Sequence, residues 1–125
     1  AVSDITFLCA TQNGGLELVK LLEELNLKTI HTYDKNPLES RRMKMGFYMG
    51  DAKIKATTLH SFKGWESKAL VILVEGLKDD ASLALLYTGL TRLKRSTEGS
   101  FLTIVSCCEG AINTFGKTWP EYVEI

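Results

Sequence analysis

The sequence predicts one α/β domain built on an open parallel sheet with helices on both faces. Short apolar runs rich in β-branched residues alternate along the chain with segments of helical periodicity, which is typical of strand–helix–strand units. The run from Ala69 to Glu75 is continuously apolar, as in a strand covered on both faces. A length of 125 residues suits a single domain with its own core. Because the chain begins almost directly in a strand, we expect residues 1–125 to be one domain of a longer protein.

Composition and charge narrow the class of protein. No apolar run is long enough to cross a bilayer and no export signal is evident, so we expect a cytoplasmic protein without membrane contact. Cys9, Cys107 and Cys108 lie in strand-like runs without CxxC spacing, which predicts buried thiols and no metal site. The formal net charge of zero argues against a domain that coats nucleic acid. Between Arg41 and Lys68, however, seven basic residues accompany two acidic ones, which indicates either a solvated face or a polyanion contact.

The first half of the chain predicts two strands and two helices. A strand from Ile5 to Ala10 leads into TQNGG, which can start a helix ending near Asn26. The apolar stripe of this helix is Leu16, Val19, Leu22 and Leu25. Thr29 to Tyr33 predicts a second strand, Asp34 to Leu38 a turn, and Glu39 to Tyr48 a short helix.

The second half continues the alternation. After a turn at Gly50 and Asp51, Ile54 to Leu59 predicts a buried strand. The loop HSFKGWES, with one short helical turn, joins it to the strand from Ala69 to Glu75. The remaining expected elements are a helix from Asp79 and Asp80 through Leu83, Leu86, Leu90 and Leu93 to Lys94 and Arg95, a strand from Phe101 to Ser106, and a short helix from Glu109 to Phe115.

The stretch IKATTLHSFKGWE carries the strongest functional signal. A strand ends here in His60, Ser61, Lys63, Gly64 and Glu66. In open α/β sheets, ligands bind just beyond the carboxyl ends of the strands, so this loop is the expected working loop. The alternative is an ordinary turn in which Gly64 is a flexible joint.

Two segments together resemble a known family. TLHSFKGWE, from Thr58 to Glu66, resembles the fifth motif of superfamily-one helicases of the UvrD/Rep type, TxHxxKGxE. LLYTGLTRLKR, from Leu85 to Arg95, is similar to their sixth motif, YVALTRA. Both occur in the family's order, separated by one apolar strand and a loop. The resemblance implies a RecA-like fold, the second motor domain of such a helicase.

The resemblance implies that Arg92 is the catalytic residue. In these enzymes ATP lies between two motor domains, and the second domain contributes an arginine to the γ-phosphate, a role that falls on Arg92. Arginine fingers accelerate phosphoryl transfer by about 10³- to 10⁵-fold. Without the motif, Arg92 reads as a helix C-terminal arginine that faces the helix dipole.

The other site residues are also implied by the family's motifs. The ATP-binding residues would be Gly64, where the backbone passes close to the nucleotide, Glu66, which can hold a ribose hydroxyl, and Lys63, which contacts nucleotide or braces the loop. Thr58 and His60 match positions that face single-stranded DNA. The remaining DNA-binding candidate, Tyr87, matches the sixth motif, as does Thr91. The alternative is that both mainly hold the helix, with Tyr87 packed in the core.

The chain also departs from the family. Cys9 stands where the fourth motif often carries a second arginine. Either the second phosphate contact is absent or it comes from elsewhere, with Arg41 or Arg42 as the candidates. About twenty residues separate Tyr33 from Ile54, so the large accessory insertion of UvrD-type enzymes has no room. No GxxxxGK[ST] loop and no acidic strand end for Mg²⁺ occurs. ATP and Mg²⁺ would therefore be bound mainly by an N-terminal motor domain of the same polypeptide.

Three functions fit these features. The first is the C-terminal motor domain of an ATP-dependent DNA helicase or translocase, inactive by itself, which supplies an arginine and part of the single-stranded DNA surface. The second is a non-catalytic nucleic-acid or protein-binding module with a helicase-derived fold, which the missing phosphate loop and Cys9 favour. The third is a small signalling or flavin domain, but TQNGG supplies neither an acidic phosphoacceptor cluster nor a flavin-binding loop.

Overall fold

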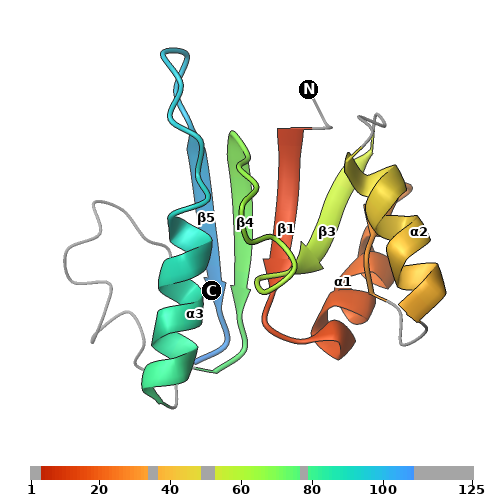
Figure 1. The fold of residues 1–125 in the computed structure, drawn as a ribbon, viewed down its shortest axis with the longest axis horizontal. Helices are drawn as coiled ribbons and strands as arrows, with labels where there is room; N and C mark the ends of the chain where they lie inside the picture. Colours follow the sequence, from red (N-terminus) through yellow and green to blue (C-terminus); the bar gives the residue numbers. More distant parts are fainter. Residues whose placement is uncertain (1–3, 34–36, 49–52, 77–78, 109–125) are drawn as a thin grey trace.

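The computed structural model describes residues 4–33, 37–48, 53–76 and 79–108 as a single sheet with helices in front of it and behind it (Figure 1). Within these residues, five parallel strands lie in the order β2–β3–β1–β4–β5. The strands are β1 Ile5–Cys9, β2 Thr29–His31, β3 Ile54–Thr58, β4 Ala69–Val74 and β5 Phe101–Ser106. The helices of the same segments are α1 Gln12–Glu24, α2 Pro37–Tyr48 and α3 Asp80–Leu90. The predicted α/β class, with a parallel sheet and helices on both faces, is confirmed.

The strand order fixes the face on which each connection lies. The chain moves in one direction along the sheet from β1 to β2, and in the other direction from β2 to β3, from β3 to β4 and from β4 to β5. Because parallel crossovers are right-handed, α1 lies on one face and the other three connections on the opposite face. Figure 1 shows this arrangement, with α2, segment 59–68 and α3 toward the viewer, on what we call the front face.

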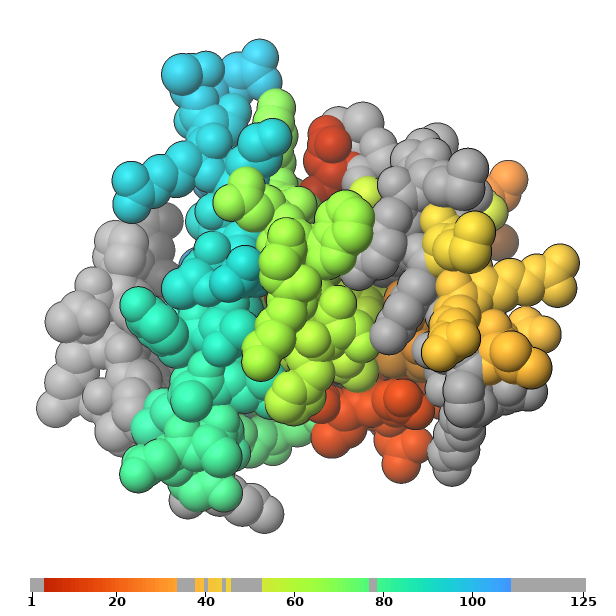
Figure 2. Space-filling model, in the orientation of Figure 1, coloured from red at the N-terminus to blue at the C-terminus, as the bar shows by residue number. Residues whose placement is uncertain are grey.

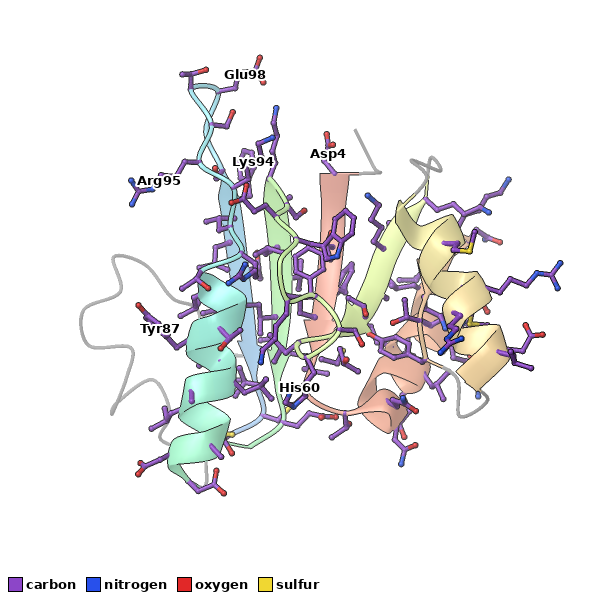
Figure 3. All side chains as sticks on the ribbon, viewed as in Figure 1. Asp4, His60, Tyr87, Lys94, Arg95 and Glu98 are labelled. Carbon is purple, nitrogen blue, oxygen red and sulfur yellow. The ribbon has the colours of Figure 1, made fainter. Side chains whose placement is uncertain are left out.

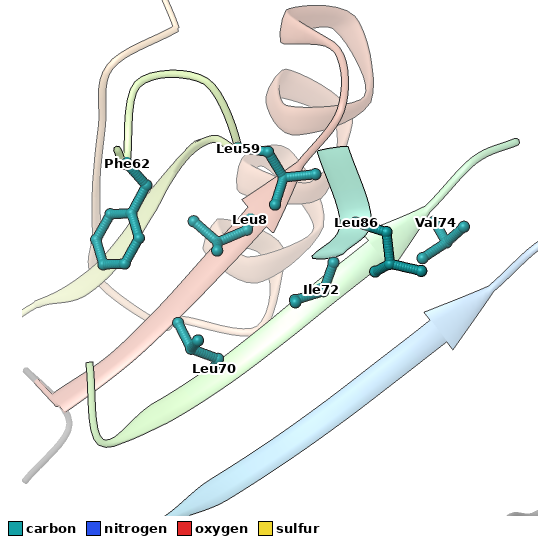
Figure 4. Close-up of a cluster of buried hydrophobic side chains, with 7 residues drawn as sticks. All are labelled: Leu8, Leu59, Phe62, Leu70, Ile72, Val74 and Leu86. Atoms are coloured by element: carbon teal, nitrogen blue, oxygen red, sulfur yellow. The ribbon is translucent and has the colours of Figure 1, made fainter. Parts of the chain in front are cut away.

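The core has a part on each side of the sheet, since neighbouring residues of a strand point to opposite faces. Leu8 belongs to the front part and Phe7 to the rear part. The front cluster, shown in Figure 4, consists of Leu8, Leu59, Phe62, Leu70, Ile72, Val74 and Leu86. The rear cluster consists of Val19, Tyr33 and Ala56, with Phe7 packed against it. The front cluster therefore lies directly beneath segment 59–68 and α3.

Helix α1 is rotated relative to the predicted apolar stripe. Gly15, Val19 and Leu22 are its buried residues, whereas the predicted Leu16 and Leu25 are 43% and 69% exposed. A Cβ at Gly15 would lie 2.2 Å from Tyr33 Cζ, so the helix presents its glycine to the tyrosine ring. The close approach at Gly15 thus sets the rotation of α1.

Several element ends differ from the prediction. Helix α2 starts at Pro37, inside the predicted turn, because proline is favoured at the first position of a helix. Helix α3 stops at Leu90 and does not reach Lys94 and Arg95, since Thr91 is its C-cap. The strands expected to reach Ala10 and Tyr33 end at Cys9 and His31. The turn at 50–51 and the helix at 109–115 lie outside the described residues.

The prediction of three buried thiols is correct for one cysteine. Cys9 is buried in β1, but Cys107 is exposed and Cys108 is partly exposed. The latter two follow β5, an edge strand whose residues are mostly exposed, so an apolar strand sequence did not guarantee burial there. Among the described residues, no helix has the length and apolar character needed to cross a membrane.

Candidate functional site

Segment 59–68 carries most of the predicted site residues across the front face. It leaves the carboxyl end of β3, passes in front of β1 and enters β4 at its amino end (Figure 1). The amide of Leu59 donates to the carbonyl of Cys9 at 3.0 Å, and the side chains of Leu59 and Phe62 are buried in the front cluster. These apolar anchors hold the segment, and His60 and residues 63–66 around them are exposed. The segment lies at the centre of the face in Figure 2.

Thr58 and His60 lie where β3 ends. The Thr58 hydroxyl accepts a hydrogen bond from the Ser61 amide at 3.2 Å and donates to Ser61 Oγ at 3.0 Å. Thr58 therefore caps the turn that follows it and is partly buried. His60 is exposed at the carboxyl edge of the sheet, as Figure 3 shows. The cap holds the histidine on a defined turn.

The KGWE residues form the exposed middle of the segment. Lys63, Gly64, Trp65 and Glu66 are all exposed, and the Trp65 amide donates to the Phe62 carbonyl at 3.1 Å. Gly64 has a φ of +84°, a left-handed conformation that glycine adopts without steric cost. A Cβ at Gly64 would meet no described residue within 4 Å. The left-handed backbone, and not crowding by these neighbours, therefore requires the glycine.

Arg92 lies just beyond α3 and beside the end of the KGWE turn. Its amide donates to the Gly89 carbonyl at 3.0 Å, and its carbonyl accepts from the Ser67 amide at 3.0 Å. The Lys94 amide donates to the Ser67 carbonyl at 2.8 Å, which makes a parallel bridge between Ser67 and Leu93. Arg92 is half-buried, and its Nε has no hydrogen-bond partner in the structure described. The fold thus brings Glu66 and Arg92, 26 positions apart in the sequence, into adjacent backbone segments.

The predicted residues at the two ends of segment 59–68 form separate groups, and Tyr87 lies apart from both. Thr58 and His60 lie at the carboxyl end of β3, whereas Glu66 and Arg92 lie toward the amino end of β4, at the other end of segment 59–68. Tyr87 is 69% exposed, so the packing alternative does not hold for it. Figure 3 shows that Tyr87 points from the outer side of α3, away from the sheet and from His60.

Cys9 does not face the KGWE turn. It belongs to the rear side of β1, is fully buried and lies beside Tyr33; burial raises the pKa of its thiol. Arg41 and Arg42 are exposed on α2, which packs on the edge strand β2. Strand β2 is three positions from β4 in the sheet, roughly 14 Å at the usual strand spacing. Within this chain, neither arginine is a neighbour of Arg92.

The carboxyl ends of β1 and β4 meet at the topological switch point of the sheet. There the Thr11 hydroxyl donates to Glu75 Oε2 at 2.8 Å and accepts from the Gly14 amide at 3.1 Å. A Cβ at Gly14 would lie 1.9 Å from Glu75 Oε1, so the carboxylate rests on the first turn of α1. This is the usual ligand position of open sheets, and a side chain of the protein itself occupies it.

A small apolar hollow lies next to this carboxylate, under the first turns of α3. Its volume is about 50 Å³, and it is lined mainly by Ala10, Leu59, Leu85 and Leu86, with Glu75 and Ser82 at its polar side. Ligand pockets for small molecules measure roughly 300–1,000 Å³, so this hollow cannot hold a nucleotide. In the described part of the chain, no three His, Cys, Asp or Glu side chains gather as metal ligands.

Two residues at which the site is assembled had no predicted role. A Cβ at Gly89 would lie 2.3 Å from Leu59 Cδ2, so this glycine lets α3 lie against segment 59–68. A glycine inside a predicted helix was the available signal for this contact. Ser67 bridges to Leu93 and is buried, and nothing in its sequence context marked it.

Comparisons with known proteins identify solved structures that have a similar fold. No family model and no curated protein matches the chain. Among solved structures, it resembles the C-terminal domain of a "possible DNA helicase" from Lactobacillus plantarum WCFS1, with 13% identity and a TM-score of 0.56 over 82% of this chain and 55% of that one. It also resembles the C-terminal part of the Fun30 ATPase domain, with 12% identity and a TM-score of 0.53 over 82% of this chain and 35% of that one.

These similarities concern the fold. The chain spans about half the length of the first structure and about a third of the second. It therefore has the fold of C-terminal domains from a helicase-type protein and an ATPase, and the matched structures do not single out the UvrD/Rep type.

Proposed function

We propose that this chain is the C-terminal motor domain of an ATP-dependent DNA helicase or translocase of the UvrD/Rep type. The observation that carries the proposal is the backbone pairing of Ser67 with Arg92 and Lys94. It joins the two segments that resemble the fifth and sixth helicase motifs, with Glu66 and Arg92 next to each other on the front face. The shared fold with the C-terminal domains of a possible DNA helicase and of the Fun30 ATPase supports the proposal.

ATP would bind between this front face and a preceding motor domain that carries the phosphate loop. Arg92 would stabilise the charge that develops on the γ-phosphoryl group, and Glu66 would hold a ribose hydroxyl. The left-handed turn at Gly64 exposes the backbone between Lys63 and Glu66 to such a ligand. Mg²⁺ would be held with the ATP phosphates by the preceding domain, because this sequence has no GxxxxGK[ST] phosphate loop.

Single-stranded DNA would cross the carboxyl edge of the sheet at Thr58 and His60. The exposed imidazole can stack on a base or contact the backbone, and the Thr58 cap fixes the turn on which it stands. His60→Ala in the longer protein should raise the DNA concentration for half-maximal stimulation of turnover several-fold. The KM for ATP should stay unchanged, because Glu66 and Arg92 lie at the other end of the segment.

The test of the proposal is ATP turnover by the longer protein with Arg92→Ala. Loss of a transition-state arginine should lower turnover by about 10³-fold or more. Arg95→Ala is the matched control, since Arg95 is an exposed arginine three residues further on that Figure 3 shows pointing outward. Turnover that survives Arg92→Ala, or that falls equally in both variants, would refute the role of Arg92.

A second function, a binding module that works without ATP, is favoured by one observation. Cys9 is buried where the family often has its second γ-phosphate arginine, and Arg41 and Arg42 are remote from Arg92. Wild-type protein that binds single-stranded DNA but shows no DNA-stimulated turnover would establish this second function.

A further inference from the structure

Ser67 is a buried hydroxyl that ties together three parts of the chain. The side chain is 8% exposed, and its Oγ donates to the Asp4 carbonyl at 2.7 Å. The same Oγ accepts a hydrogen bond from Thr6 Oγ1 at 3.1 Å, and Thr6 is itself buried. Because buried polar groups are costly to leave unpaired, this set of bonds fixes Ser67 against the start of β1.

The backbone of Ser67 holds the peptide units on both sides of Leu93. Its amide donates to the Arg92 carbonyl and its carbonyl accepts from the Lys94 amide, at 3.0 and 2.8 Å. On the helix side, the Arg92 amide is bonded to the Gly89 carbonyl at 3.0 Å. The main chain of Arg92 is therefore held from the helix at one end and from Ser67 at the other.

The side chain of Arg92 has less support than its backbone. Its Nε is buried but has no hydrogen-bond partner in the structure described, so this atom does not fix the direction of the guanidinium. The direction in which the side chain leaves the surface then depends on the Arg92 backbone. Ser67 also directly follows Glu66, so a single anchor sets both groups of the proposed ATP face.

We propose that Ser67 is the positioning residue for Arg92, acting through the backbone bridge and held by the Thr6 hydroxyl and the Asp4 carbonyl. This inference rests on the proposed function, because it assumes that Arg92 acts on ATP. Ser67→Ala would remove the hydrogen bonds of Ser67 Oγ to the Thr6 hydroxyl and the Asp4 carbonyl and so loosen the bridge. Arg92 would then be present but displaced, and small displacements of catalytic groups cost turnover.

The first test is steady-state ATP turnover by the longer protein with Ser67→Ala. We expect kcat to fall about 10-fold or more, since a displacement of ~1 Å can cost about 10²-fold, while KM for ATP changes less than about twofold. Thr6→Val should reproduce part of the loss with Ser67 intact. Thr32→Val is the matched control, because it removes another buried hydroxyl pair, Thr32 with Thr57 at 2.5 Å, that does not bond to the Arg92 bridge.

A double variant separates positioning from general structural damage. In the Arg92→Ala background, measured over long incubations, Ser67→Ala should cause no further loss, because a positioning residue acts only through the arginine. Two results would overturn the inference. The first is that Ser67→Ala and Thr6→Val both keep turnover within twofold of wild type. The second is that Ser67→Ala lowers the rate of the Arg92→Ala protein by the same factor by which it lowers the rate of the wild type. If the Ser67→Ala protein does not fold, the Thr6→Val variant replaces it, and its effect on turnover is compared between the wild-type and Arg92→Ala backgrounds in the same way. Wild-type turnover that is indifferent to Arg92→Ala identifies failure of the proposed function itself.

Discussion

Gly89 is a residue at which α3 lies close against segment 59–68. A Cβ there would meet Leu59 Cδ2 at 2.3 Å, and Leu59 is itself buried in the front cluster. Gly89 also supplies the carbonyl that accepts from the Arg92 amide. At the scale of single residues, a missing methyl group therefore decides how closely the two motif-like segments approach.

Gly89→Ala should destabilise the chain despite the higher helix propensity of alanine. Overpacking typically costs about 1–3 kcal/mol, and the alanine recovers about 0.5–1 kcal/mol, so we expect a net loss of about 1 kcal/mol. Urea unfolding of the chain measures this change in the free energy of unfolding. In a Leu59→Ala background the clash with Leu59 is removed and only the 3.2 Å contact with Ile72 Cδ1 remains, so Gly89→Ala should there be close to neutral. Equal destabilisation in both backgrounds would show that the Leu59 contact is not the cause.

Cysteine reactivity tests the assignment of Cys9 to the interior. Burial raises the pKa of the Cys9 thiol, so less thiolate is present at neutral pH, and the side chain is inaccessible. Alkylation of the folded chain should modify the exposed Cys107 and spare Cys9, which should react only in denaturant. Rapid modification of Cys9 in the folded chain, detected by peptide mass mapping, would mean that the rear side of β1 is open.

At the scale of elements, α3 depends on its amino-terminal cap. The Asp79 carboxylate accepts hydrogen bonds from the Ser82 amide at 2.8 Å and the Ser82 hydroxyl at 2.7 Å, and these bonds lower the pKa of Asp79. A lowered pKa means that the folded state favours the carboxylate. Its contribution is therefore complete above the ordinary pKa of about 4 and is lost as the pH falls through the lowered value.

The pH dependence of stability checks this cap. Asp79→Asn keeps a capping oxygen but removes the charge, so the variant should lose less stability than wild type between about pH 5 and 2. Asp79→Ala should be less stable than wild type at neutral pH, where the capping carboxylate is lost. Identical acid unfolding curves for wild type and Asp79→Asn would show that the charge of Asp79 does not contribute to the pH dependence of stability.

The elements show where sequence patterns succeed and where they fail. Strand and helix order was predicted correctly over the described residues because period-two and period-3.6 patterns indicate the type of element, even in β5, where they did not predict burial. The rotation of α1 was predicted incorrectly, since it depends on the contact of Gly15 with Tyr33 across the fold. The end of α3 was also missed, because the bridge from Ser67 competes with further helical turns. Such long-range contacts leave no local pattern.

The candidate site shows the same division. The two motif-like segments were recognisable in the sequence, and their pairing on one face follows from the sheet order. The outward direction of Tyr87 and the rearward direction of Cys9 could not be predicted, because a shift of one residue in a strand, or a rotation of a helix, reverses a side chain's face. The directions of these side chains could be determined only from the structure.

At the scale of the whole molecule, the proposed function makes this chain one half of a nucleotide cleft. Glu66 and Arg92 lie on an outer face, and the hollow of about 50 Å³ beside Glu75 is too small for ATP. The 125-residue chain alone should therefore show no ATP binding below millimolar concentration by calorimetric titration. Micromolar binding by the isolated chain would contradict the two-domain account.

The most direct test of the central claim is binding of a transition-state mimic. The longer protein should bind ADP with aluminium fluoride more tightly than ADP alone, since an arginine that acts on developing charge favours the transition state. Arg92→Ala should abolish this preference and leave ADP affinity nearly unchanged, while Arg95→Ala should retain it. An Arg92→Ala protein that keeps the full preference for the mimic would show that Arg92 does not reach the transferred phosphoryl group.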